Sequence, residues 1–188
     1  MPCMGPAEPK PGPIVLNGMR NLVRAVLVFA ALPLLAQPAT SPSSEADVMR
    51  AVLQSQQRAT RLRANKVILL AGATNTAPLP SAKVADDLKS DFQSKNAKAG
   101  TVAQMQPPVR IADVASLRGA NGYEWKQIAE KYPEADMLVE LSRPGFNRAQ
   151  NTAVISATMV KPNGAKTYVY QLKRKDGQWV VDGLEGPF

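Results

Sequence analysis

The last third of the chain constrains the fold most strongly, because its residues alternate with the period of a half-buried β-strand. Apolar side chains occupy every second position over 153–159 and over 168–172. An Asn-Gly pair at 163–164 separates these segments, and this pair is a strong signal for a tight β-hairpin. A Lys-Asp-Gly run at 175–177 predicts a second tight turn before a last strand at 179–181. The pattern therefore predicts an antiparallel β-meander.

The residues before the meander carry the apolar spacing of helices. We predict three helices, over 46–63, from Ser81 onward, and from Asn121 or Gly122 to Pro133. Short apolar runs predict further strands at 66–71, 109–111 and 138–142. A meander alone buries too little apolar area to be stable. We therefore expect an α+β fold, in which an antiparallel β-meander of three to five strands is covered by two or three helices.

A pattern typical of an export signal lies near the start of the chain. Arg20 and Arg24 are followed by an apolar run at 25–36 and then by small residues. The run is too short to cross a bilayer, which takes about 20 apolar residues. We expect a signal helix within a signal peptide at 19–39, cleaved after Ala36 or Ala39. The protein is then periplasmic or secreted, with no transmembrane span after cleavage.

The remaining segments follow from this assignment. Residues 1–18 are rich in proline, and we interpret them either as a mis-assigned start upstream of Met19 or as a disordered leader. Residues 40–45 are expected to form a linker. Residues 46–188 have the length of one ordinary domain, so we expect a single α+β domain there.

The composition excludes several kinds of catalytic chemistry. The chain has no histidine, which removes Ser-His-Asp and Cys-His nucleophile systems and histidine-ligated zinc. Its single cysteine, Cys3, lies ahead of the export signal, so the exported part has no thiolate ligand or redox-active thiol. We expect no cofactor and no metal centre, and we lean toward a protein that is not an enzyme.

Two carboxylates across a cleft would still suffice for glycoside hydrolysis. The candidates for such a pair are Glu124, Glu130, Glu134, Asp136 and Glu140. The positions of Glu124 and Glu130 are typical of a solvated helix face, and no spacing in the sequence sets two carboxylates opposite each other. A glycan-type hydrolase is therefore the alternative and not the first hypothesis.

The net charge of +8 favours anionic partners. The basic residues are scattered among acidic ones and form no run of five or six like charges. Arg58, Arg61 and Arg63 lie at the end of the first predicted helix, where cations stabilise the helix dipole. The export signal argues against nucleic acid as a partner. An envelope protein or an anionic polymer is the expected kind of partner.

Arg143 and Asn147 are the candidate contacts for a ligand or partner. They flank a Pro-Gly pair at the end of a predicted strand, where side chains can meet a ligand. In the functional interpretation Arg143 binds an anion or a peptide. In the structural interpretation Arg143 pairs with a carboxylate on a neighbouring helix, Asn147 bonds its own backbone and Phe146 anchors the loop in the core. The sequence leaves both interpretations open.

The run LVELSRPGFN at 138–147 is followed by NTAV at 151–154, a tyrosine-bearing strand and KDGQWVV at 175–181. This order resembles a group of bacterial exported proteins of unknown function that share an SRxGFN segment. The resemblance implies a small α+β domain and supplies no activity. Members of the group often carry a cysteine pair where this chain has the tight turn at 161–164.

The leading hypothesis is therefore an exported protein that acts as a non-enzymatic binding or interaction domain in the cell envelope. The alternatives are a carboxylate-based hydrolase and a purely structural accessory domain. A polar pocket with two close carboxylates would favour the hydrolase. An exposed apolar patch or an open sheet edge would favour a protein partner.

Overall fold

The computed structural model describes residues 43–60, 62, 65–79, 83–106, 108–120 and 122–188. The expected leader, the expected signal peptide with its helix, and the first half of the expected linker lie outside the described residues, whereas residues 43–45 of that linker belong to the first helix. The described residues all belong to one compact unit. None of their helices is both long enough and apolar enough to cross a membrane.

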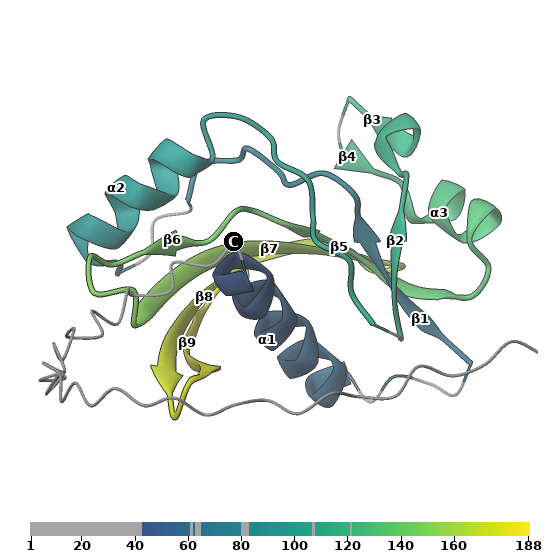
Figure 1. Ribbon diagram of the computed structural model, residues 1–188. Coiled ribbons are helices and arrows are strands. Elements are labelled where there is room, and N and C mark those ends of the chain that lie inside the picture. The colour runs from purple at the N-terminus through teal and green to yellow at the C-terminus, as the bar shows by residue number, and fades with distance from the viewer. Residues whose placement is uncertain (1–42, 61, 63–64, 80–82, 107, 121) are drawn as a thin grey trace, which may run out of the picture. The chain divides into compact units, whose positions relative to one another are not determined.

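The described chain contains three α-helices, one short 3₁₀-helix and a set of strands (Figure 1). The helices are α1 (Ser43–Thr60), α2 (Asp86–Lys95), the 3₁₀-helix η1 (Ala115–Leu117) and α3 (Trp125–Lys131). The first strands are β1 (Val67–Ala71), β2 (Val109–Ala112), β3 (Arg118–Gly119), β4 (Gly122–Tyr123) and β5 (Ala135–Leu141). The others are β6 (Gly145–Phe146), β7 (Thr152–Lys161), β8 (Gly164–Lys175) and β9 (Gln178–Glu185).

The main sheet is mixed, with the strand order β2-β1-β5-β7-β8-β9 and β6 paired to β7. Strands β5, β7, β8 and β9 pair antiparallel in that order, and both predicted tight turns lie between them. Strands β2 and β5 both run parallel to β1. The α+β class is confirmed, but the sheet is mixed, and the expected antiparallel meander accounts only for its part from β5 to β9 and not for β1 and β2.

The parallel part follows from the connections between its strands. The segment from β1 to β2 carries α2, and the segment from β2 to β5 carries η1 and α3. Parallel strands need such a long crossover, whereas a two-residue turn joins antiparallel ones. The two turn signals near the C-terminal end therefore predicted only the pairing of the strands that these turns connect, which are β7, β8 and β9.

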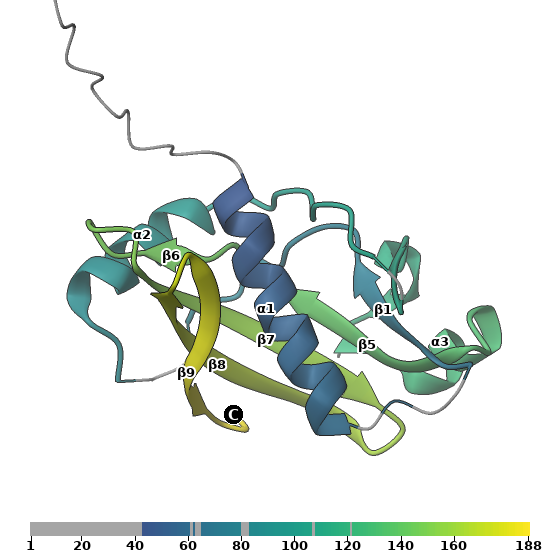
Figure 2. The same cartoon turned by 60° about the horizontal axis from the view of Figure 1, so that its bottom comes forward.

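The helices cover both faces of the sheet (Figures 1 and 2). Helix α1 lies across one face and buries Val48, Val52 and Leu53 against alternate residues of β1, β5, β7 and β8. On the other face, α3 packs Ile128 against β1 and β5, and α2 packs Phe92 against β7 and β8. Strands β1 and β5 are buried on both faces, which explains why β1 is a continuous apolar run and why β5 is apolar apart from Asp136 and Glu140.

All three helices begin at other residues than expected, and the first begins at Ser43 instead of 46. The third helix begins at Trp125, because Gly122 and Tyr123 pair with Arg118 and Gly119 in a small antiparallel ladder. Gly122 has a φ of +99°, which glycine adopts without strain and which turns the chain into this ladder. The second helix begins at Asp86, and the expected cap residue Ser81 lies outside the described residues.

We predict that Gly145→Ala destabilises the protein, because Gly145 allows α2 to lie directly on β6. A Cβ atom at this position would lie 2.6 Å from the Phe92 backbone nitrogen and 2.7 Å from the Leu88 carbonyl oxygen. We expect the free energy of unfolding to fall by about 1–3 kcal/mol in urea denaturation. Gly183→Ala is the control, because its Cβ would meet the Gln171 Cβ atom at an ordinary 3.6 Å. Equal stability of the two variants would contradict this account of the α2–β6 contact.

Candidate functional site

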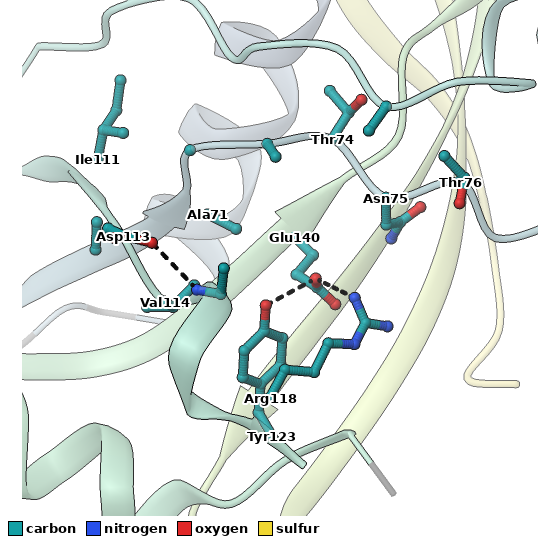
Figure 3. Close-up of a pocket in the computed structure, with 15 residues that line it drawn as sticks. Ala71, Thr74, Asn75, Thr76, Ile111, Asp113, Val114, Arg118, Tyr123 and Glu140 are labelled. Atoms are coloured by element: carbon teal, nitrogen blue, oxygen red, sulfur yellow. Dashed lines mark hydrogen bonds and ion pairs between the residues drawn. The ribbon is translucent and has the colours of Figure 1, made fainter. Parts of the chain in front are cut away.

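A cavity of about 590 Å³ opens where the parallel strands β1 and β2 end (Figure 3). Its walls are the segment 71–76 that leaves β1, the segment 111–115 that leaves β2, Ala99, and three polar side chains from other strands. These three are Arg118 of β3, Tyr123 of β4 and Glu140 of β5. The carboxyl ends of parallel strands are a common ligand site, because the chain diverges there and leaves a crevice.

Glu140 is the central group of this cavity. Its side chain is only 7% exposed, because β5 runs through the middle of the sheet. Arg118 Nη1 lies 3.1 Å from Glu140 Oε1, and the Tyr123 hydroxyl donates to the same oxygen at 3.2 Å. The Arg118 guanidinium also lies over the Tyr123 ring, 5.5 Å from its centroid. A buried carboxylate is thus paired with a cation and a phenol, both held by the β3–β4 ladder.

Burial and the neighbouring Glu140 carboxylate together raise the pKa of Tyr123 from its ordinary value of 10.0 to about 12. Burial is the larger cause, since it disfavours the phenolate, and the Glu140 charge and hydrogen bond act in the same direction. Arg118 acts against both. The Tyr123 hydroxyl therefore stays protonated at physiological pH and donates a hydrogen bond to Glu140.

The opposite wall of the cavity supplies further polar groups. Thr74 is fixed by two hydrogen bonds to Gly100, one from its backbone N–H and one to its hydroxyl oxygen, both 2.8 Å long. Asn75 is 8% exposed, and its backbone N–H donates to the Leu141 carbonyl oxygen at 2.9 Å. The Asn75 amide oxygen is buried without a hydrogen-bond partner among the described residues. Leaving a buried acceptor without a hydrogen bond reduces the stability of the folded state by about 1–3 kcal/mol. The Asn75 amide oxygen is therefore an acceptor that the fold itself does not use.

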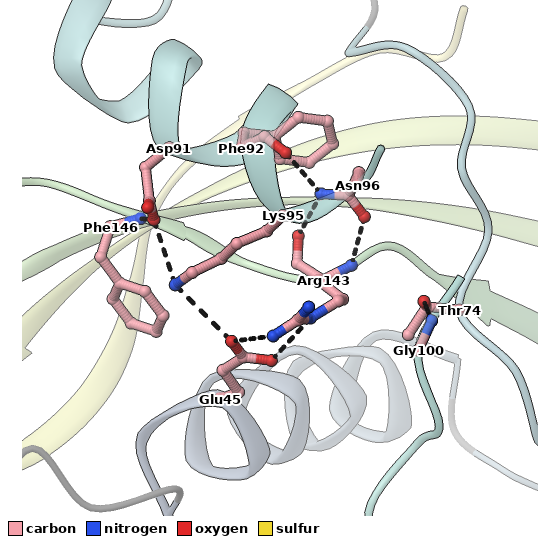
Figure 4. Close-up of polar contacts among 9 residues, drawn as sticks. All are labelled: Glu45, Thr74, Asp91, Phe92, Lys95, Asn96, Gly100, Arg143 and Phe146. Atoms are coloured by element: carbon pink, nitrogen blue, oxygen red, sulfur yellow. Dashed lines mark hydrogen bonds and ion pairs between the residues drawn. The ribbon is translucent and has the colours of Figure 1, made fainter. Parts of the chain in front are cut away.

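Arg143 lies at the end of β5, outside this cavity, and its polar groups are used within the protein (Figure 4). Its Nε and Nη2 atoms bind the two carboxylate oxygens of Glu45 on α1, at 3.2 and 3.0 Å. Its backbone N–H and carbonyl oxygen bind the Asn96 side chain at 2.8 and 2.9 Å. Lys95 extends the network, lying 3.6 Å from Glu45 and 3.1 Å from Asp91. These contacts match the structural interpretation, in which Arg143 pairs with a helix carboxylate.

Asn147 likewise closes its own loop. Its side-chain oxygen accepts hydrogen bonds from the backbone N–H groups of Asn151 and Thr152, at 3.0 and 3.1 Å. Phe146, beside it, is buried, and its backbone N–H donates to Asp91 at 2.7 Å. Asn147 also borders an open cavity of about 770 Å³ beside α2. Arg143 and Asn147 therefore flank β6, and the polar groups of each are engaged within the protein, those of Arg143 with α1 and Asn96 and those of Asn147 with the turn that follows β6.

The five candidate carboxylates do not meet at one site. Only Glu140 lines the cavity at the ends of β1 and β2, whereas Glu134 pairs with Arg110 and Glu124 accepts a hydrogen bond from Gln127. The second carboxylate in that cavity is Asp113, which is not among the five candidates. The Asp113 Oδ1 atom accepts from the Ala115 N–H at 3.3 Å, one residue ahead of Val114, which is the N-cap of η1.

The sequence-based reasoning missed Arg118, Tyr123 and Asn75 as site residues. The available signal was Glu140 itself, since it is the one charged residue between Met137 and Leu141 in a run that is otherwise apolar. Such a residue in a strand buried on both faces requires a partner brought in from elsewhere. The sequence does not indicate which residues those partners are.

Among the described residues, no three His, Cys, Asp or Glu side chains lie close enough together to hold a metal ion. No protein-family model matches this chain, and no curated protein or solved structure matches it either. The resemblance to exported proteins with an SRxGFN segment thus stays a prediction from the sequence.

We predict that the protein loses stability as the pH rises from about 10 toward 12. Burial, followed by the neighbouring Tyr168, also raises the pKa of Tyr170 to about 12. The unfolded chain releases a tyrosine proton near pH 10, whereas folded Tyr123 and Tyr170 keep theirs, so the unfolded state is favoured as the pH rises through this interval. Urea denaturation across this pH range should show the loss, and Tyr123→Phe should reduce its slope. An unchanged slope in Tyr123→Phe would contradict the assigned environment of Tyr123.

Proposed function

We propose that this chain is a non-enzymatic, exported binding domain of the cell envelope, and that its binding site is the cavity around Glu140. The observation that carries the proposal is a buried carboxylate in the wall of an open cavity at the ends of parallel strands. Export, with a periplasmic or secreted location, is supported by the basic and apolar pattern at 20–36.

The cavity favours a ligand with hydrogen-bond donors, either neutral or cationic. Its charged lining groups are Asp113, Arg118 and Glu140, so one more acid than base lines it, although the chain as a whole is basic. Both hydrogen bonds to Glu140 end on Oε1, and no described residue donates to Oε2. A hydroxyl, amide or ammonium group could therefore bind the second oxygen without displacing Arg118 or Tyr123. An anionic envelope polymer, favoured by the net charge, would have to contact surfaces outside this cavity.

The hydrolase alternative is supported by one observation, namely that Asp113 and Glu140 line the same cavity. Glycoside hydrolysis needs one carboxyl group that gives a proton and a second that attacks the sugar or activates water. Here Glu140 accepts from Arg118 and Tyr123, and Asp113 accepts from a backbone N–H. Both carboxylates act as acceptors, and this arrangement favours binding over acid–base catalysis.

A protein partner at an open sheet edge is less well supported. Strand β9 forms one edge of the sheet, but an irregularity in its pairing with β8 interrupts it. Asp182 on this strand binds Lys173 at 2.7 Å. Bulges and charges are the devices by which edge strands avoid pairing with other chains.

Binding at the cavity is tested with purified protein and the low-molecular-weight fraction of a bacterial envelope extract, read out by native mass spectrometry. We expect one retained small molecule per chain. Ala115→Trp should abolish its retention by filling the cavity from an exposed position in its wall. Glu140→Gln should weaken binding about 10-fold or more, because a charged hydrogen bond is worth about 1.5–3 kcal/mol.

Ala149→Trp is the matched control, since Ala149 is also exposed but does not line the cavity. Retention lost equally in both tryptophan variants, or in neither, would contradict the proposed site. A retained molecule that is converted to a lighter product during incubation would favour the hydrolase. If nothing is retained, the purely structural alternative is favoured.

A further inference from the structure

A second cavity, of about 320 Å³, lies between the last turns of α1 and the strands β7 and β8. It is distinct from the cavity around Glu140, since the two have no lining residue in common. Met159, Tyr168 and Leu184 form its apolar surface, and the buried pair of Gln56 and Tyr170 lies beside them, joined by a side-chain hydrogen bond.

An irregularity in β9 places Leu184 at this cavity. Leu172 pairs with Val181 and Gln171 pairs with Gly183, so Asp182 is one extra residue in β9. The extra residue reverses the alternation of β9 from that point, and Leu184 comes to lie opposite Tyr170, on the face that α1 covers. Leu184 is nevertheless 54% exposed, so this fold directs a large apolar side chain into an open cavity.

The charge of this cavity is uniformly positive. Lys161 and Lys166 line it at the end of the β7–β8 hairpin, and no carboxylate is among its lining residues. Neither lysine takes part in an ion pair among the described residues. An apolar surface with two lysines at one end is complementary to a molecule with an anionic head and an apolar body.

We propose that this cavity binds a free, single-chain carboxylate amphiphile, whose carboxylate lies at Lys161 and Lys166 and whose chain covers Met159, Tyr168 and Leu184. Binding removes the exposed part of Leu184 from water, and the favourable free energy scales with the apolar area so buried. The lysines give the site its preference for an anion. This proposal is independent of the ligand proposed for the Glu140 cavity.

The test is calorimetric titration of the purified protein with decanoate below its micellar concentration. We expect saturable binding of one decanoate per chain, and binding of the neutral analogue decanol at least 10-fold weaker. The double variant Lys161→Glu/Lys166→Glu should weaken decanoate binding at least 10-fold. The matched control Lys98→Glu/Lys126→Glu makes the same change in net charge at exposed positions that do not line the cavity, and it should bind as the parent does.

Three further variants test the apolar contact and separate this cavity from the one around Glu140. Ala59→Trp fills the cavity from an exposed position on α1 and should abolish binding, and Leu184→Ala should weaken it without adding bulk. Glu140→Gln should leave decanoate binding unchanged. The proposal is overturned by absence of binding, by equal weakening in the two lysine double variants, or by decanol binding as tightly as decanoate. Binding only to vesicles of anionic phospholipid, and not to free decanoate, would assign the lysines to a membrane surface instead.

Discussion

Strand β5 runs through the middle of the sheet and carries Glu140 into a place that water barely reaches. A charged group so placed must be paired within the protein, since an unpaired buried charge costs several kcal/mol. Arg118 and Tyr123 supply that pairing, and both come from the β3–β4 ladder. The position of this ladder, the wall of the adjoining cavity and the polarity of that cavity therefore all depend on one carboxylate.

The same principle applies just beyond the same end of β5. Arg143 follows the strand and binds Glu45 of α1 through two hydrogen bonds, while its backbone binds Asn96 beside α2. A bidentate guanidinium–carboxylate pair fixes orientation as well as distance. The most conspicuous basic residue of the SRxGFN segment thus ties two helices to the sheet. The cavity around Glu140 is left as the better candidate for a ligand, because its acceptors are not all satisfied internally.

Local signals predicted the elements but not the site. The alternation over 153–159 and the Asn-Gly turn act over a few residues, so the strands β7, β8 and β9 followed from the sequence. The parallel pairing of β1 with β2 and β5 depends on crossovers that have no local signature. The partners of Glu140 lie 22 and 17 residues away from it in the sequence, and Glu45 lies 98 residues from Arg143. Contacts between residues so far apart in the sequence leave no local pattern. The sequence therefore indicated that Glu140 needs a partner but not which residue that partner is.

The most direct test of the central claim is to locate the ligand by NMR. Amide shifts of ¹⁵N-labelled protein are compared before and after addition of the low-molecular-weight fraction of an envelope extract. Binding at the Glu140 cavity predicts shifts that cluster in the backbone at 72–76 and 113–118, which forms its walls. Shifts that cluster instead at 143–151 would contradict that claim and restore Arg143 and Asn147 as the ligand contacts.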